Sequence, residues 1–330
     1  MKFGLFYQIQ VPKPWDEQSE ARRIWEALDQ IAFAEEMGYD SVWFSEHHFR
    51  PVWSHNSAPD LTLAAVTQRT SRIRMGIGVV LAPIHHPLHT AARMATLDIL
   101  SKGRVDVGLG RTGYPYQLTP YGTTLEDTRG MWEEFAQVLP RIWTEEEVSH
   151  DGEFFHIPPR NGGPDRVAGT LELYQKSLNG AHGPTINSQN ALMTAGFCHE
   201  DAKVAKSRGT ELISWYLDQQ RERARLVWRG VDPASVPPDY QGYYERDMRL
   251  AAGPHEGDPT PSEVVDRGAN FCVGTPDDCI RFVENYEAMG IEQIFCLSAI
   301  GPATNEETMN TLRMFGKHVI PHFKAKEKAA

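Results

Sequence analysis

The feature that most constrains this chain is a short apolar run that ends abruptly in titratable side chains. Residues 41–49 read Ser-Val-Trp-Phe-Ser-Glu-His-His-Phe. The β-branched and aromatic side chains at its start are typical of a short buried strand. Glu46, His47 and His48 follow at once, and a buried strand would not tolerate them. Because α/β enzymes present catalytic groups at the carboxyl ends of parallel strands, this stretch predicts a strand whose tip is a functional site.

Strands and helices alternate along the chain, which indicates a parallel sheet with covering helices. Six candidate strands lie near residues 3, 42, 74, 105, 192 and 294. Their spread over 330 residues favours one (β/α)8 barrel domain over an open doubly wound sheet. Gly113 is out of phase with Gly108 and Gly110, so no dinucleotide-binding GxGxxG fingerprint is present. Residues 231–262, rich in Pro and Gly, predict an ordered excursion or lid.

Composition excludes several classes of partner. The formal charge of −11 argues against nucleic acid or an anionic membrane as the main partner. No window approaches the roughly 18 apolar residues that a membrane span requires. The four cysteines show no CxxC pairing, which predicts reduced thiols and a cytoplasmic protein.

Three strand ends would meet if the sheet closes into a barrel. The first is followed by Glu46 and His47, the second contains the glycine-rich stretch at Gly78-Val79, and the third is followed by Arg111 and Tyr114. The guanidinium fork of an arginine matches a phosphate, and imidazole exchanges protons near neutral pH. A flat ring could therefore lie against the third strand, with a phosphate toward the arginine and a reactive edge near the histidine. Flavin mononucleotide (FMN) fits that description.

Plainer interpretations stay open for each of these residues. His47 and His48 could be ordinary hydrogen-bonded histidines, Arg111 a surface ion pair, and the strand glycines a packing device. The first third of the chain is also rich in histidine, which would suit a metal-dependent barrel hydrolase. However, its strand ends lack the several carboxylates that such sites need, so we expect no metal.

Several motifs resemble the bacterial luciferase-like, flavin-dependent monooxygenases, which share a (β/α)8 barrel. The matching stretches are MKFGLF at 1–6, GYDSVW at 38–43, EHHF at 46–49, LSKGR at 100–104, RTGY at 111–114 and VGTP at 273–276. The resemblance covers nearly all of the chain.

The resemblance implies roles for particular residues. His47, with Glu46 beside it, is the histidine needed for productive flavin chemistry. Gly78-Val79 is a non-prolyl cis peptide against the flavin ring, and Arg111, with Tyr114, lies on the phosphate side. Phe49 and Trp215 are expected to line the substrate pocket.

One departure from the family lies at Asn161-Gly162. Roughly forty residues, about one to two βα units, are missing there relative to the family pattern. We interpret this as a segment missing from the sequence rather than as a shortened barrel, because every other element is intact.

The sequence therefore predicts a flavin-dependent monooxygenase. Reduced FMN, supplied by a separate reductase, would form a C4a-hydroperoxide with dioxygen and oxygenate a small, largely apolar organic substrate. We also expect a homodimer. The alternatives are a deazaflavin-dependent oxidoreductase, a flavin-binding protein without turnover, and the metal-dependent hydrolase.

Overall fold

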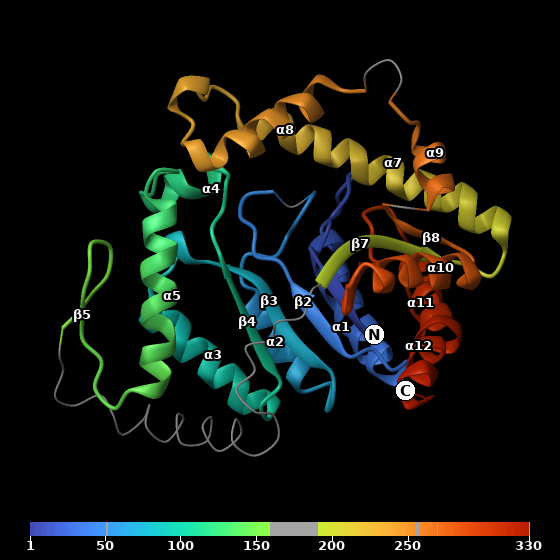
Figure 1. Cartoon of the computed structure of the whole chain (residues 1–330), viewed down its shortest axis with the longest axis horizontal. Coiled ribbons are helices and arrows are strands. Elements are labelled where there is room, and N and C mark those ends of the chain that lie inside the picture. Colours follow the sequence, from blue (N-terminus) through green and yellow to red (C-terminus); the bar gives the residue numbers. More distant parts are fainter. Residues whose placement is uncertain (51, 159–190, 255–257, 269, 330) are drawn as a thin grey trace.

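A sheet of parallel strands organises the chain, and the first and last strands in the sequence lie side by side in it (Figure 1). The structure is a computed structural model and describes residues 1–50, 52–158, 191–254, 258–268 and 270–329. Within these ranges the main sheet has seven strands in the order β4-β3-β2-β1-β9-β7-β8, all paired in parallel. The strands are β1 (Lys2–Tyr7), β2 (Ser41–Phe44), β3 (Arg74–Leu81), β4 (Val105–Gly110), β7 (Ala191–Cys198), β8 (Cys272–Gly274) and β9 (Gln293–Leu297).

All six strands predicted from the sequence are present, and β8 is an additional one. A separate hairpin joins β5 (His150–Asp151) to β6 (His156–Ile157). The pairing of β1 with β9, for example Leu5 with Cys296, is the return of last strand to first that a barrel requires. β4 and β8 are the outer strands of the described sheet. The predicted break at Asn161-Gly162 lies outside the described residues.

Helices follow most of the strands and cover the sheet (Figure 1). They are α1 (Ser19–Glu36), α2 (Pro59–Thr67), α3 (Pro87–Ser101), α4 (Pro115–Leu118), α5 (Thr128–Thr144), α7 (Ala202–Val227), α8 (Gln241–Ala252), α9 (Pro261–Arg267), α10 (Pro276–Ala288), α11 (Asn305–Met314) and α12 (Ile320–Ala329). The start of α10 shows why helices begin where they do. The Thr275 hydroxyl accepts the Asp278 N–H, the Asp278 carboxylate accepts the Thr275 N–H, and Pro276 occupies the first helical position.

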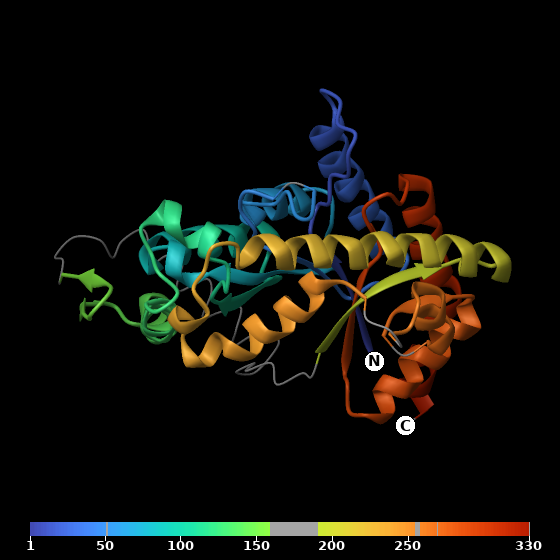
Figure 2. The same cartoon turned by 90° about the horizontal axis from the view of Figure 1, so that it is seen from above.

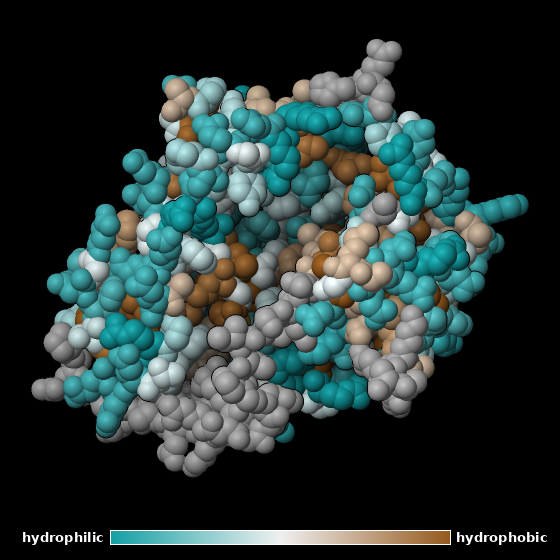
Figure 3. All heavy atoms as spheres, in the orientation of Figure 1, coloured by the Kyte–Doolittle hydropathy of each residue, from teal (hydrophilic) through white to brown (hydrophobic). Residues whose placement is uncertain are grey.

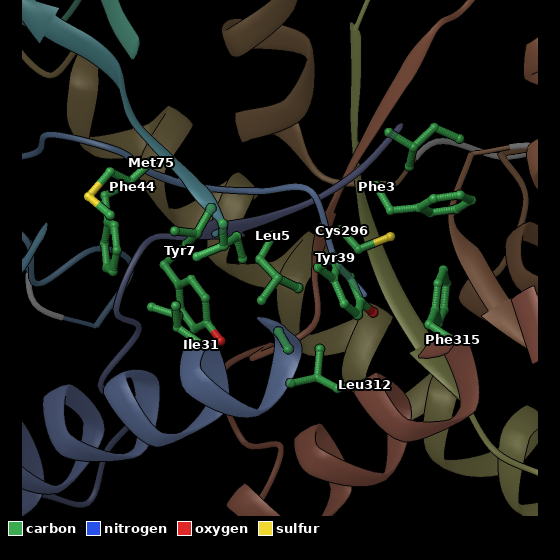
Figure 4. Close-up of a cluster of buried hydrophobic side chains, with 14 of the residues drawn as sticks. Phe3, Leu5, Tyr7, Ile31, Tyr39, Phe44, Met75, Cys296, Leu312 and Phe315 are labelled. Carbon is green, nitrogen blue, oxygen red and sulfur yellow. The ribbon is translucent and has the colours of Figure 1, made fainter. Parts of the chain in front are cut away.

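The main core lies between the first strands and the helices packed against them. Figure 4 shows Leu5 and Tyr7 of β1 approaching Ile31 of α1 and Leu312 of α11. Leu5, Ile31 and Leu312 are at most 1% exposed. Burying an aliphatic side chain of this size contributes about 1.5–3 kcal/mol, so this layer fixes the strands whose far ends carry the site.

Two helices form a layer over the carboxyl ends of the strands. α7 and α8 lie together in both views, above α4 and the ends of β3 and β4 (Figures 1 and 2). The described part of the predicted excursion is thus largely helical, with α8 as its main element. This segment packs on α7 and is therefore part of the folded domain. We call the layer formed by α7 and α8 the roof.

All four cysteines are buried and form no disulfide. A hydrogen bond with Cys279, together with burial, raises the pKa of the Cys198 thiol. No helix within the described ranges is both long and apolar enough to cross a membrane.

Candidate active site

A cavity of about 320 Å³ opens at the carboxyl ends of β2, β3 and β4, beneath α8. This volume lies in the range of small-molecule sites, about 300–1,000 Å³. In the space-filling view this side of the molecule is hollowed at its centre, below the α7–α8 layer (Figure 3). The predicted site residues that line the cavity are Glu46, His47, Gly78, Val79, Arg111 and Tyr114. The three strand ends therefore converge as predicted.

Glu46 ties the end of β2 to the end of β3. Its side chain is 2% exposed, and Oε2 accepts the backbone N–H of Leu81 at 3.1 Å. Its Oε1 lies 3.0 Å from His48 Nε2 and 2.6 Å from His85 Nε2. Burial by itself would raise the pKa of Glu46, but the two imidazoles and the backbone N–H outweigh it and lower the pKa to about 2. Glu46 is thus an ionised carboxylate already saturated by its own partners, which suits an anchoring role.

His48 completes this anchor. Its Nδ1 lies 3.1 Å from the Tyr121 hydroxyl, while Nε2 faces Glu46. Both ring nitrogens are engaged, and the side chain is buried. The plainer interpretation, an ordinary hydrogen-bonded histidine, therefore describes His48.

His47 points the other way and lines the cavity. Its ring centroid lies 4.4 Å from that of Trp53 and 6.2 Å from that of Tyr114, to which it is nearly parallel. Its backbone N–H donates to the carbonyl of Asn56 at 3.1 Å. Burial lowers the pKa of His47 to about 3, although the nearby Glu46 raises it in part. The imidazole is therefore neutral at physiological pH, with one donor nitrogen and one acceptor nitrogen.

The peptide bond between Gly78 and Val79 is cis, as the resemblance implied. It lies where the β3–β4 register shifts, between Ile77 and Val80. The plainer interpretation of the strand glycines, that they serve packing, describes one of them. A Cβ on Gly76 would lie 2.7 Å from the Trp43 ring, and one on Gly78 would lie 3.2 Å from it. Gly76 thus makes room for an indole of the neighbouring strand, while the backbone at 78–79 lines the cavity.

Arg111 is already paired. Its Nη1 lies 2.6 Å from Asp239 Oδ2, and its guanidinium lies 4.7 Å from the centroid of the Tyr240 ring. Tyr240 in turn donates its hydroxyl to the Thr112 carbonyl at 3.2 Å. Both charged side chains of the ion pair are about one quarter exposed. An ion pair in contact with water gains little net free energy, so an anion of a ligand can compete with Asp239.

Sequence reasoning missed a second ion pair under the roof. Arg223 of α7 donates from both Nη atoms to Asp247 of α8, at 2.9 and 2.8 Å, and both side chains are at most 3% exposed. Trp228 Nε1 also donates to Asp247, at 3.2 Å, and Arg223 reaches the Tyr114 hydroxyl at 3.3 Å. The sequence did contain a signal for this ion pair. Arg223 falls on the buried stripe of α7, at helical spacing from Tyr216 and Val227, and a buried arginine demands an acidic partner.

Two predicted pocket residues are not brought to this cavity. Phe49 is 61% exposed and is not among the residues that line it. The Trp215 ring instead lies against Gly301, where an added Cβ would come within 2.1 Å of it. Both assignments stay predictions for the substrate side of the site. The described residues contain no group of three or more His, Cys, Asp or Glu side chains placed to hold a metal ion.

The profile of the luciferase-like monooxygenase family matches residues 1–170 of the 330 in the chain, slightly more than half. The chain belongs to the luciferase-like monooxygenase family. The family predicted from the sequence motifs is confirmed, and its enzymes are oxidoreductases of the monooxygenase type.

Similarity to individual luciferase-like proteins extends over nearly the whole chain. The 4-hydroxyprotoasukamycin monooxygenase of Streptomyces nodosus subsp. asukaensis is 26% identical over 326 residues, 91% of this chain and 87% of that protein. The FMN complex of the oxygenating constituent of 3,6-diketocamphane monooxygenase from Pseudomonas putida has a TM-score of 0.69 at 20% identity, covering 97% of this chain and 98% of that one. The coenzyme F420-dependent tetrahydromethanopterin reductase of Methanopyrus kandleri has a TM-score of 0.61 at 16% identity, covering 98% and 99%. These structures confirm the luciferase-like barrel fold.

We predict that Asp247→Asn strongly destabilises the protein. It removes the charge that compensates buried Arg223, and breaking such a pair costs about 3–5 kcal/mol. Asp266→Asn, which removes an exposed partner of Lys206, should cost no more than about 1 kcal/mol. Free energies of unfolding from urea titrations at neutral pH measure both changes. Equal effects of the two substitutions would contradict the prediction.

The same pair predicts a pH dependence. Burial opposes ionisation of Asp247, but hydrogen bonds and charge from Arg223 and Arg246 lower its pKa overall. A lowered folded-state pKa stabilises the protein above the unfolded value of about 3.9, and the effect is lost as the pH falls below it. The stability difference between wild type and Asp247→Asn should therefore shrink in acid.

Proposed function

We propose that this protein binds reduced FMN, supplied by a separate flavin reductase, and oxygenates a small organic substrate with dioxygen. The observation that carries the proposal is the convergence of His47, the Gly78-Val79 peptide and Arg111 on one cavity. A neutral imidazole, a stretch of backbone and a cation are what a planar ring with a phosphate tail requires. Reduced FMN, when bound, would supply the electrons that activate dioxygen.

The cavity offers cationic groups to an anionic tail. Two arginines and two carboxylates line it, which are Arg111, Arg246, Glu46 and Asp247. Arg246 pairs with the buried Asp247, whereas the partner of Arg111, Asp239, is partly exposed. We therefore assign Arg111 as the cation that a ligand contacts. We infer that the phosphate of FMN takes the place of Asp239 there.

The remaining lining supports a site from which water is excluded. Tyr114, Trp228, Tyr240 and Tyr243 supply aromatic surface around the cavity. A largely apolar substrate would displace water from these rings, and excluding water protects reactive intermediates. The reaction role belongs to His47, whose neutral imidazole can hold or move a proton at the reacting edge of the ring.

Two further features of the prediction concern partners. The Pseudomonas putida protein is an oxygenating constituent, which supports a separate protein that supplies reduced flavin. We also infer a homodimer, which is supported by exposed large apolar side chains such as Leu61, Trp25 and Met289, 63–74% exposed. A cytoplasmic location belongs to the same proposal.

The experiment that tests the function is anaerobic reconstitution followed by turnover. We expect binding of FMN in an absorption titration, and incorporation of one atom of 18O from dioxygen into a product from a panel of small apolar compounds. Preferential binding of coenzyme F420 with hydride transfer would replace the proposal by the deazaflavin alternative. FMN binding with only hydrogen peroxide formed across the panel would favour a flavin-binding protein without turnover.

We predict that His47→Ala retains FMN binding but lowers oxygenation by roughly 10²–10⁴. The substitution removes the neutral imidazole from the reacting edge and leaves the backbone and Arg111 in place. Product formed per reduced flavin is the measurement. His156→Ala, which removes an exposed histidine of the β5–β6 hairpin, is the matched control and should behave as wild type. An unchanged product yield in His47→Ala would remove this histidine from the chemistry.

We predict opposite effects for the two members of the Arg111–Asp239 pair. Arg111→Ala should weaken FMN by about 10- to 150-fold while riboflavin, which has no phosphate, changes little, since a charge-assisted hydrogen bond contributes on the order of 1.5–3 kcal/mol. Asp239→Asn should tighten FMN relative to riboflavin, because it removes the competing anion. Calorimetric titration of both ligands into each variant measures the ratio. Equal losses for FMN and riboflavin in Arg111→Ala would show that the phosphate lies elsewhere.

A further inference from the structure

Gln117 is a fully buried amide that touches the histidine of the site. It lies on α4, the single helical turn that follows Tyr114, and is 0% exposed. Its Nε2 lies 3.3 Å from His47 Nδ1 and 3.1 Å from the Tyr116 hydroxyl. Its Oε1 is buried and has no hydrogen-bond partner among the described residues. The amide thus connects the loop after β4 with the tip of β2.

A buried amide with an unpaired oxygen is unfavourable, and a leucine or methionine would fill a similar volume without that penalty. The fold therefore gains nothing from the oxygen of this side chain. The amide has only two described partners, and one of them is a ring nitrogen of His47. What Gln117 contributes is control over that ring.

We propose that Gln117 is a positioning residue that holds His47 in the tautomer with its proton on Nε2, so that this N–H is the donor presented to the cavity. The inference rests on the proposed function, because it assigns the direction in which His47 acts. The Gln117 amide N–H donates to Nδ1, and a nitrogen that accepts a hydrogen bond carries no proton. The single proton of a neutral imidazole must then sit on Nε2.

The surroundings keep the ring in this state. The Trp53 and Tyr114 rings lie 4.4 and 6.2 Å from the imidazole centroid, and Gln117 occupies the Nδ1 edge. Three charged or titratable groups that act on the ring follow β2 as His47 does, and the fourth lies on α7: Glu46, His48, Arg50 and Arg223. Their effects on the pKa of His47 oppose one another, and burial has the largest effect. His47 therefore donates to an oxygen atom of the bound ligand, and it does not accept a proton from it at Nε2.

The test is nitrogen NMR of protein labelled with 15N-histidine, because imidazole nitrogens with and without a proton have well separated shifts. The ligand-free protein and its complex with oxidised FMN are measured between pH 6 and 9, and His47→Ala identifies the signals. We expect a protonated Nε2 and an unprotonated Nδ1 throughout. A proton on Nδ1 in the wild type would overturn the proposal, since the amide oxygen would then face the ring.

Two substitutions separate positioning from mere packing. In Gln117→Glu the carboxylate can only accept, so a proton should move to Nδ1, with or without a second proton on Nε2. In Gln117→Leu the Nδ1 contact is lost, and oxygenation should fall about 10- to 100-fold, as for outer-shell partners that orient metal-bound imidazoles, with little change in FMN affinity. The same proton pattern in Gln117→Glu as in wild type would overturn the proposal.

Control variants separate the tautomer of His47 from the proposed enzymatic function. Tyr116→Phe removes the second partner of the amide and should leave the His47 proton on Nε2, and the exposed Gln68→Leu should change nothing. Because the NMR signals need neither substrate nor turnover, a protein that never oxygenates can still confirm the tautomer. If Gln117→Leu fails to fold, Gln117→Met provides the apolar variant.

Discussion

The carboxylate of Glu46 is the contact on which the geometry of the site depends. It is buried and ionised, and a buried charge persists only where its partners compensate for the loss of water. Those partners come from the tip of β2 and from the segment that ends β3, so the two strand ends must stay together for the charge to be tolerated. His47 lies in sequence between Glu46 and its partner His48. Fixing both neighbours fixes the backbone from which His47 reaches the cavity.

Two arginine–aspartate pairs near the cavity differ in how easily their partners can be replaced. The Arg223–Asp247 pair is almost fully buried and bidentate, and it holds α8 on α7. Its two charges compensate each other at a place where water cannot solvate them. The Arg111–Asp239 pair is about one quarter exposed and monodentate, so water or a ligand can replace either partner at little cost. The same two residue types therefore serve as a fixed support in one place and an exchangeable contact in the other.

Much of the fold could be predicted because it follows local patterns. Apolar runs of the right length predicted six strands, and all six are present. A packing role for the strand glycines was one interpretation of the sequence, but the partner of Gly76 could not be predicted, because the Trp43 ring belongs to another strand. The positions of Phe49 and Trp215 likewise depend on how loops and helices pack. Phe49 is largely exposed, and Trp215 fills the space beside Gly301.

The sequence by itself determined which residues stand at the mouth of the sheet. Parallel strands end at the same edge of a sheet, so polar residues that follow two of them, Glu46 with His47 and Arg111, were expected together. The glycines of the strand between them added Gly78-Val79 to the same edge. Only the tertiary structure decided what each of them faces. Arg111 meets an aspartate 128 residues away, and His47 meets an amide 70 residues away. Such pairings depend on how separate elements pack, and the local periodicity of the sequence contains no information about this packing. The folded chain therefore decides that Glu46 is a fixed charge, that Arg111 has an exchangeable partner and that His47 is neutral.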